Sequence, residues 1–169
     1  FYAYQTTGDT YVNFLKVAAP SVPVTGKVTL QDFGGTVLGK QVAIDIVDGS
    51  GNVVQSHTAT LDASGNYTIQ STVQGSYRVA AKASHWLRAM TGTISIGSTG
   101  ATNVNFSLVN GDIDNDNVVT VFDYNALSDA FDTAEGDTNW NAQADLDGDG
   151  AVTVFDYNIL SQNFDLSGD

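Results

Sequence analysis

Acidic residues recur at a fixed spacing in the last third of the chain, in two copies of a twelve-residue pattern at residues 112–123 and 145–156. Each copy carries Asp at positions 1, 3, 5 and 12, the spacing with which a loop wraps a hard cation in oxygen ligands. Position 7 would add a backbone carbonyl, and position 9 a hydroxyl or a bridging water. We therefore expect two calcium ions. The ligand residues would be Asp112, Asp114, Asp116, Val118, Thr120 and Asp123 in the first loop, and Asp145, Asp147, Asp149, Ala151, Thr153 and Asp156 in the second.

The two loops differ at position 6, where the backbone of such a loop turns sharply. Gly150 stands there in the second loop and accepts a positive φ without strain, whereas Asn117 in the first loop does so at a modest cost. The first site is therefore expected to be the weaker one. The alternative is that both loops are acidic, solvated turns, but two matched copies of the pattern favour calcium.

A short apolar pattern follows each loop and repeats at the same offset of 33 residues as the loops. Its members recur at helical spacing. They are Val121, Tyr124, Leu127 and Phe131 in the first copy, and Val154, Tyr157, Leu160 and Phe164 in the second. Thr120 with Asp123, and Thr153 with Asp156, also have the spacing of a helix capping box. Each loop is thus predicted to lead directly into a short amphipathic helix whose first turn holds the last ligand.

The segment from residue 111 to 169 resembles the type I dockerin family, because its loops are duplicated, end in Asp instead of Glu and follow no long amphipathic helix. The resemblance implies a small helical unit that folds around calcium and docks onto cohesin modules of extracellular scaffolds. It also implies that loop positions 10 and 11 and the next helix contact the partner. Those loop positions often hold Ser-Thr in the family and here hold Val-Phe. The corresponding residues are Val121, Phe122, Ser128, Val154, Phe155 and Ser161.

Charge is distributed unevenly along the chain. Of the 19 acidic residues, 14 lie at or after Asp112, whereas all six Lys and Arg residues lie before it. So concentrated a negative charge repels itself until cations bind, and we expect calcium to be required for the last third to fold. The sequence also lacks a basic patch that would displace counterions from phosphates, which argues against nucleic acid as a partner.

Composition favours a secreted or cell-surface protein, which we expect to be bacterial. The chain has no cysteine, which excludes a disulfide framework and thiolate chemistry. No run approaches the roughly 18 apolar residues of a membrane span, and the chain begins at Phe1, as expected of a processed piece of a secreted protein. Calcium loops that end in Asp suit a calcium-rich exterior.

Residues 1–20 are predicted to form an N-terminal β arm. Two apolar, aromatic-rich runs at residues 1–4 and 11–17 have the composition of strands, and Pro20 and Pro23 form a stiff break before the next domain. The arm is the end of an upstream β domain, or a strand pair that packs on its own chain, or it donates strands to an open sheet edge of a neighbouring molecule. The last interpretation follows from the marginal stability of a lone hairpin.

Residues 24–109 are predicted to form an Ig-like β-sandwich, because short β-type runs alternate with turn clusters. The expected strands cover residues 25–31, 41–47, 53–61, 66–71, 75–83, 87–96 and 102–108. The runs at residues 26–30, 61–67, 75–79 and 83–87 are similar to the prealbumin-like sandwiches of carboxypeptidase-regulatory and Cna B-type domains. That resemblance implies a stalk, spacer or adhesion module without catalysis. The predicted fold class is therefore mainly β: a sandwich followed by a small, α-helical double EF-hand unit at residues 111–169.

Only residues 109–111 separate the last predicted strand from the first metal ligand, so the two domains should move as one rigid body. We do not expect an enzyme. His57 and His85 are the only histidines and lie in different strand regions without a nearby nucleophile pattern. The only glutamate, Glu135, leaves no pair of carboxylates for glycoside hydrolysis outside the calcium loops.

The sequence favours a non-catalytic, extracellular assembly protein that joins copies of itself, or a fixed protein partner, into a filament or surface structure. One alternative is a dockerin module that targets an absent enzyme to a cohesin scaffold. Another is a carbohydrate-binding accessory module, in which Trp86 and Tyr77 would line the sugar site. A Trp in a sandwich strand is more often part of the core, which weakens this last alternative.

Overall fold

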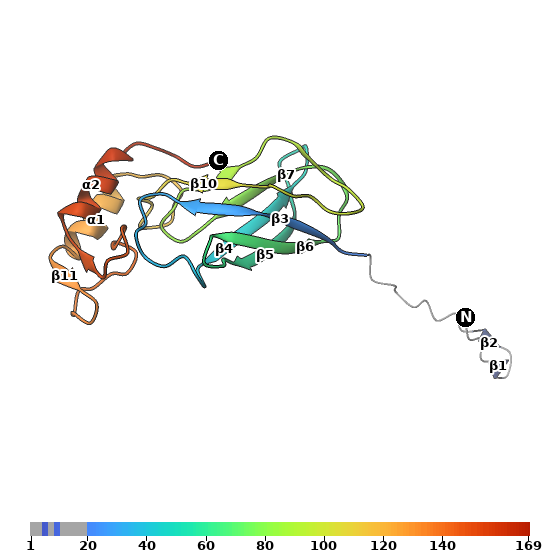
Figure 1. The fold of residues 1–169 in the computed structure, drawn as a ribbon, viewed down its shortest axis with the longest axis horizontal. Helices are drawn as coiled ribbons and strands as arrows, with labels where there is room; N and C mark the ends of the chain where they lie inside the picture. The colour runs from blue at the N-terminus through green and yellow to red at the C-terminus, as the bar shows by residue number, and fades with distance from the viewer. Residues whose placement is uncertain (1–4, 7–8, 11–19) are drawn as a thin grey trace.

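The computed structural model describes residues 5–6, 9–10 and 20–169 (Figure 1). This part of the chain is mainly β, with two sheets followed by a unit of two short helices, as the sequence predicts. Near the N-terminus, the two-residue strands β1 (Gln5–Thr6) and β2 (Asp9–Thr10) pair antiparallel. The arm strands predicted at residues 1–4 and 11–17 lie outside the described residues.

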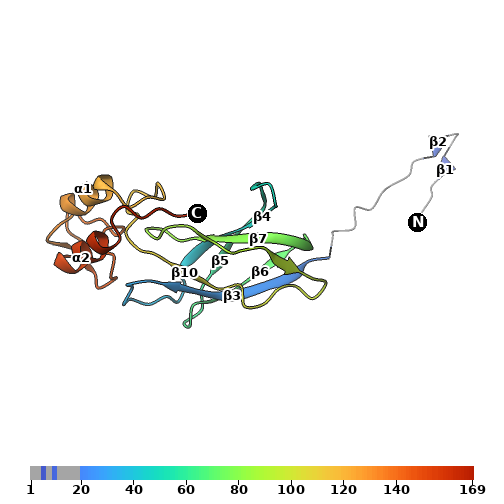
Figure 2. The same cartoon turned by 90° about the horizontal axis from the view of Figure 1, so that it is seen from above.

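The sandwich consists of a three-stranded and a five-stranded sheet. In the first, β3 (Val22–Leu30) lies between β6 (Asn66–Ser71), which is antiparallel to it, and β10 (Phe106–Leu108), which is parallel to it. The second has the order β5–β4–β7–β8, and β9 also pairs with β7. Figure 2 shows β3 and β7 in opposite layers. The strands of the second sheet are β4 (Gln41–Val47), β5 (Val53–Thr60), β7 (Gly75–Lys82), β8 (Ala89–Met90) and β9 (Ile94–Ile96).

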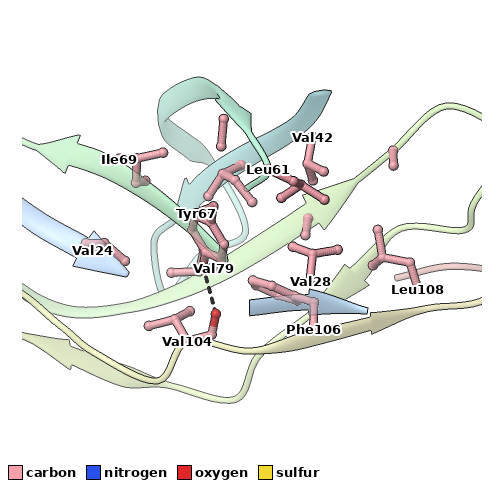
Figure 3. Close-up of a cluster of buried hydrophobic side chains, with 14 of the residues drawn as sticks. Val24, Val28, Val42, Leu61, Tyr67, Ile69, Val79, Val104, Phe106 and Leu108 are labelled. Carbon is pink, nitrogen blue, oxygen red and sulfur yellow. Dashed lines mark hydrogen bonds between the residues drawn. The ribbon is translucent and has the colours of Figure 1, made fainter. Parts of the chain in front are cut away.

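Alternate residues of both sheets fill the space between them. β6 shows this most clearly, because its side chains are exposed and buried in strict turn, as the pleat of a strand requires. Figure 3 shows Tyr67 among the aliphatic side chains of this core. The Tyr67 hydroxyl donates a hydrogen bond of 2.8 Å to the carbonyl of Val104, so the only polar atom of this buried ring is satisfied.

Two of the predicted strands are shorter than expected, for local reasons. The strand predicted at residues 87–96 divides into β8 and β9, which pair with β7 on either side of residues 91–93. Those three residues lie opposite only Arg78 and Val79, which is the geometry of a β-bulge. The strand predicted at residues 102–108 is reduced to β10, because Asn103 adopts a positive φ of 58° that a strand does not accommodate.

The helices begin and end close to where the sequence predicts. α1 (Val121–Asp129) has Thr120 as its N-cap, α2 (Val154–Gln162) has Thr153, and both helices show the predicted capping box. The apolar pattern is only partly buried, however. Leu127 and Leu160 are buried, whereas the other six members of the pattern are exposed on the surface. Two short helices cannot enclose a broad apolar stripe by themselves, so much of it stays in contact with solvent.

Each of the two repeats forms β-type backbone pairs with the other. The strand β11 (Thr133–Ala134), which follows α1, pairs with β12 (Ala151–Val152) in the second loop. The equivalent bridge, displaced by 33 residues, joins Val118 of the first loop to Ser167, which follows α2. Each loop is therefore held by the tail of the other repeat, and a second hydrophobic core that includes Leu127, Leu146 and Leu160 lies between them.

Backbone and side-chain contacts fix the sandwich to the helical unit. The amides of Gly111 and Asp112 donate to the carbonyl of His85, at 2.9 and 3.0 Å. On the side of the second loop, the Gly34 amide donates to the carbonyl of Asp147 at 2.8 Å. Contacts to both loops support the expectation that the two domains move together. Among the described residues, every helix is too short and too polar to span a membrane.

Candidate functional site

The first loop brings three carboxylates together at its open side. Asp112, Asp114 and Asp116 each offer an oxygen, and these oxygens lie within 4.8 Å of one another. Asp112 is fully buried, and its Oδ1 has no hydrogen-bond partner in the part of the chain that the structure describes. A buried carboxylate oxygen without a donor is costly, and a bound cation removes that cost. The donor set therefore fits a hard divalent ion.

The backbone of the first loop turns as position 6 requires. Asn117 has a positive φ of 74°, and its amide donates to Asp112 Oδ2 at 3.1 Å. Asp114 and Asp116 accept further loop amides, from Asp116 and Val118 respectively, at 3.2 and 2.9 Å. These hydrogen bonds hold the carboxylates of positions 1, 3 and 5 on one side of the loop.

The carboxylates of the second loop are clustered in the same way, but the hydrogen-bond donors to the first of them differ. The oxygens of Asp145, Asp147 and Asp149 again lie within 4.8 Å of one another. Among the described residues, the hydrogen-bond donors to Asp145 are loop amides: Oδ1 accepts from Gly148 at 3.0 Å and from Asp149 at 3.2 Å, and Oδ2 accepts from Gly150 at 3.1 Å. Gly150 has a φ of 91°, as expected at position 6.

The carboxylates at position 12 hold each loop closed. Asp156 is fully buried, and its Oδ1 accepts the amides of Leu146 and Asp147 at 2.7 and 3.1 Å. Its Oδ2 accepts the Thr153 amide at 2.7 Å as part of the helix cap. Asp123 is held in the corresponding way by the amides of Asp114 and Thr120. Position 12 thus closes the loop and caps the helix, beside the three clustered carboxylates.

The remaining predicted ligands also have places in the backbone framework. The hydroxyls of Thr120 and Thr153 accept the amides of Phe122 and Phe155, both at 3.2 Å, and so serve as helix caps. Val118 and Ala151, at position 7, belong to the pairs exchanged between the repeats. The exchange places position 7 of each loop against the other repeat, so the two loops form one unit.

Burial, and then the closeness of other carboxylates, determines the acidity of the clustered aspartates. Burial raises the pKa of Asp114, Asp145 and Asp147 above the ordinary value, and neighbouring carboxylates raise it further. Part of this shift is offset by the loop amides that the carboxylates accept. A divalent cation would stabilise the ionised form of each group, since an opposite charge nearby favours it.

The sandwich contributes one cation to the first loop, which the sequence does not indicate. The Nζ of Lys82, at the end of β7, lies 2.7 Å from Asp112 Oδ2 and 2.6 Å from Asn115 Oδ1. A contact between residues 30 positions apart depends on how the two domains are joined. Lysine at the end of a strand, next to a turn, gives no signal of it.

An apolar surface extends across both helices beside the loops. Phe122 and Phe155 are each 64% exposed, and Val121 and Val154 are about half exposed. Between the helices, Tyr124, Leu127, Ser128, Phe131, Val154 and Tyr157 line a shallow groove. We call the exposed part of this surface the helix face; it consists of Val121, Phe122, Tyr124, Ser128, Phe131, Val154, Phe155, Tyr157, Ser161 and Phe164. All six residues predicted to contact a partner are exposed, and two of them, Ser128 and Val154, line the groove.

The structure argues against Trp86 as part of the alternative sugar site. Trp86 is only 1% exposed, and its Nε1 donates to the carbonyl of Gln31 at 3.1 Å. One face of its ring lies against His85, with ring centroids 3.8 Å apart, and Phe33 meets it edge-on at 5.4 Å. A ring enclosed in this way cannot stack on a sugar, so Trp86 is part of the core.

The chain resembles solved structures although its sequence matches neither a known family profile nor any curated protein. One is described as an N-terminal interface mutant of a type II Cohesin-X-Dockerin complex from Acetivibrio cellulolyticus. It has a TM-score of 0.69 and 21% identity, and the match covers 87% of this chain and 97% of that one. A C-terminal interface mutant of the same kind of complex gives a TM-score of 0.70 at 19% identity, with the same coverage.

The matched part of the chain is longer than the part that forms the strands of the sandwich. A match over 87% of 169 residues involves about 147 residues, whereas β3 to β10 extend only from residue 22 to 108. The likeness therefore extends beyond the strands of the sandwich.

Proposed function

We propose that this chain is a protein-docking module of an extracellular assembly, in which two calcium ions stabilise the helical unit and the helix face binds a protein partner. The observation that supports it most directly is the helix face itself. Monomeric proteins rarely leave so many large apolar side chains exposed on one surface unless that surface binds something. Aromatic side chains such as Phe122 and Phe155 are typical anchors of protein interfaces.

The ions would be held by the clustered carboxylates. Asp112, Asp114 and Asp116 would bind one of them, and Asp145, Asp147 and Asp149 the other. Calcium supplies positive charge at two points where the chain concentrates negative charge. Asp123 and Asp156 close the loops and cap the first turns of the helices that carry the helix face.

A cohesin-type partner is favoured over a second copy of the chain. The two similar structures come from complexes that contain a cohesin and a dockerin, and the match covers nearly all of the chain compared. The Val-Phe pairs on the helix face favour a partner whose own contact surface is apolar, because burial of apolar area provides most of the favourable free energy of such contacts.

Self-association through the same helix face is the second candidate. The internal repeat of the helical unit supports self-association. It gives similar side chains to both halves of the helix face, and a surface with twofold symmetry can be complementary to itself. In this form the protein would assemble into dimers or longer structures without any other component.

Binding and size measurements distinguish the two. The chain is mixed with a panel of cohesin modules in millimolar-range calcium and measured by calorimetry, and its mass alone is measured by light scattering after size exclusion. Binding to a cohesin by a monomeric chain supports docking. Oligomers of the chain alone that dissociate when Phe122 and Phe155 are changed to Asp support self-association. A monomer that binds no cohesin would contradict both.

A further inference from the structure

Lys82 occupies an unusually rich cage of oxygen atoms at the back of the first loop. Besides Asp112 Oδ2 and Asn115 Oδ1, its ammonium donates to the carbonyls of Ser84 and Trp86, at 2.9 and 2.8 Å. The side chain is 20% exposed, whereas that of Asp112 is completely buried. The ammonium is therefore held by the sandwich and directed at the first ligand of the loop.

Among the described residues, no lysine or arginine forms an ion pair with the second loop; Lys40 shares a pocket with Asp145 and Asp149, but its ammonium lies over the Phe33 ring, 4.6 Å from the ring centroid. Asp145, which corresponds to Asp112, accepts hydrogen bonds from three loop amides. In the described part of the chain, the ion pairs are those of Lys82 with Asp112 and of Arg88 with Asp45, and neither involves the second loop. Two loops of nearly the same sequence are thus electrostatically different.

The two oxygens of Asp112 have separate roles. Oδ2 accepts the Lys82 ammonium at 2.7 Å and the Asn117 amide at 3.1 Å. Oδ1 is buried without a partner among the described residues and is the atom left for an ion. A single buried carboxylate would then lie between two cations, one fixed in the chain and one from solution.

We propose that Lys82 is an internal counter-cation of the first loop, which stabilises the loop in the absence of calcium and lowers its affinity for calcium relative to the second loop. The inference rests on the proposed calcium sites. Without the ion, Lys82 faces the full negative charge of Asp112, Asp114, Asp116 and Asp123. With the ion bound, part of that charge is neutralised, so Lys82 is less strongly attracted.

Reciprocity fixes the sign of the effect. Because calcium weakens the interaction of Lys82 with the loop, Lys82 must weaken the binding of calcium by the same free energy. As calcium rises, the second loop fills first. As it falls, the first loop keeps its attachment to the sandwich through Lys82. The chain then stays organised at the domain junction at calcium concentrations where the first site is empty.

The test measures calcium affinity of the first loop alone. Asp149→Ala blocks the second site, and Lys82→Met or Lys82→Gln is added to this background; Gln removes the charge and keeps a shorter side chain with hydrogen-bond donors. Lys27→Met, an exposed lysine in β3, is the control with the same change of net charge. Calorimetric titration should show affinity of the first loop about tenfold higher in both Lys82 variants, within the usual range for coupling between two ligands. The Lys27 control should be unchanged.

Thermal unfolding of the whole chain, with and without calcium, gives a second readout. The rise in Tm between EGTA and saturating calcium should be larger in Lys82→Met than in the parent, because the variant loses more stability without calcium than with it. An equal or smaller rise, or an affinity that does not increase, overturns the role of Lys82. If the protein with native loops binds no calcium at all, the proposed calcium sites are wrong, which is a separate result.

Discussion

Tyr124 and Tyr157, which occupy the same position in α1 and α2, meet edge to face with their ring centroids 6.2 Å apart. The contact lies where the two repeats meet, and Phe122 and Phe155 occupy equivalent positions of the two helices. A partner that binds one half of the helix face would meet a closely similar set of side chains on the other half.

The first prediction follows from this symmetry. Phe122→Asp alone and Phe155→Asp alone should each leave partner binding within a fewfold of the parent, because the other orientation remains available. The double variant should lose at least about 2 kcal/mol of binding free energy, the usual cost of removing an interface anchor. Calorimetry or surface plasmon resonance with the identified partner measures all three. Two single variants that each abolish binding would show that one orientation alone is used.

The second prediction concerns the two ions. Asp116→Ala and Asp149→Ala are a matched pair, since both remove the carboxylate at position 5 and both residues are exposed. Each should lower the number of calcium ions bound from two to one, as seen in a calorimetric titration. Each should also lower Tm in saturating calcium, because one source of binding free energy is lost. Binding of two ions by either variant would exclude position 5 as a ligand.

The third prediction is a dependence of stability on pH that comes from His85. Burial lowers the pKa of this imidazole from its ordinary value of 6.5 to about 4 in the folded protein. Between those values the unfolded chain binds more protons than the folded one, so stability present above pH 6.5 is lost as the pH falls towards 4. The contribution approaches about 1.4 kcal/mol per pH unit within that window.

Urea unfolding at pH 7.5, 6 and 5 in saturating calcium measures this dependence. His85→Gln should unfold more readily than the parent at pH 7.5, and the difference between the two proteins should shrink towards pH 5. Because both proteins carry the same calcium loops, effects of acid on the carboxylates cancel in the comparison. If the difference in unfolding free energy between the parent and His85→Gln is the same at all three pH values, His85 is not the group responsible for the pH dependence.

The fourth prediction tests the contact between the sandwich and the second loop. A Cβ on Gly148 would lie 2.2 Å from the ring of Phe33, and the residue has a φ of 76°. Gly148→Ala should therefore destabilise the protein by more than the roughly 1 kcal/mol expected of a positive φ alone. Adding Phe33→Ala should recover part of the loss, which a double-mutant cycle from urea unfolding would detect. Strictly additive effects would mean that the ring does not limit the space at Gly148.

The sequence predicts those elements whose cause is local. The caps Thr120 and Thr153 place both helix starts at the correct residue, because a capping box acts within a single turn. β4 and β6 have their predicted bounds because their apolar residues alternate and turns flank them. The bulge between β8 and β9 was not predicted, because it depends on the register against β7.

The features missed at the candidate site are long-range. The cage around Lys82 is assembled from the end of β7, the turn after it and the first loop. The fit of Phe33 against Gly148 depends on how the sandwich meets the second loop. The spacing of apolar residues along the chain also does not reveal which of them other parts of the protein will bury. The exposure of Phe131 and Phe164 was therefore not predicted.

The exchanged pairs between the repeats have a consequence for how such a unit arises. Thr133–Ala134 completes the second loop, and Ser167 completes the first, so neither half can satisfy its own backbone. A peptide with one repeat would find the missing pairs only in a second molecule of itself. The present unit therefore pairs its two repeats as the two chains of a homodimer would pair, and the connecting segment keeps both halves in one molecule.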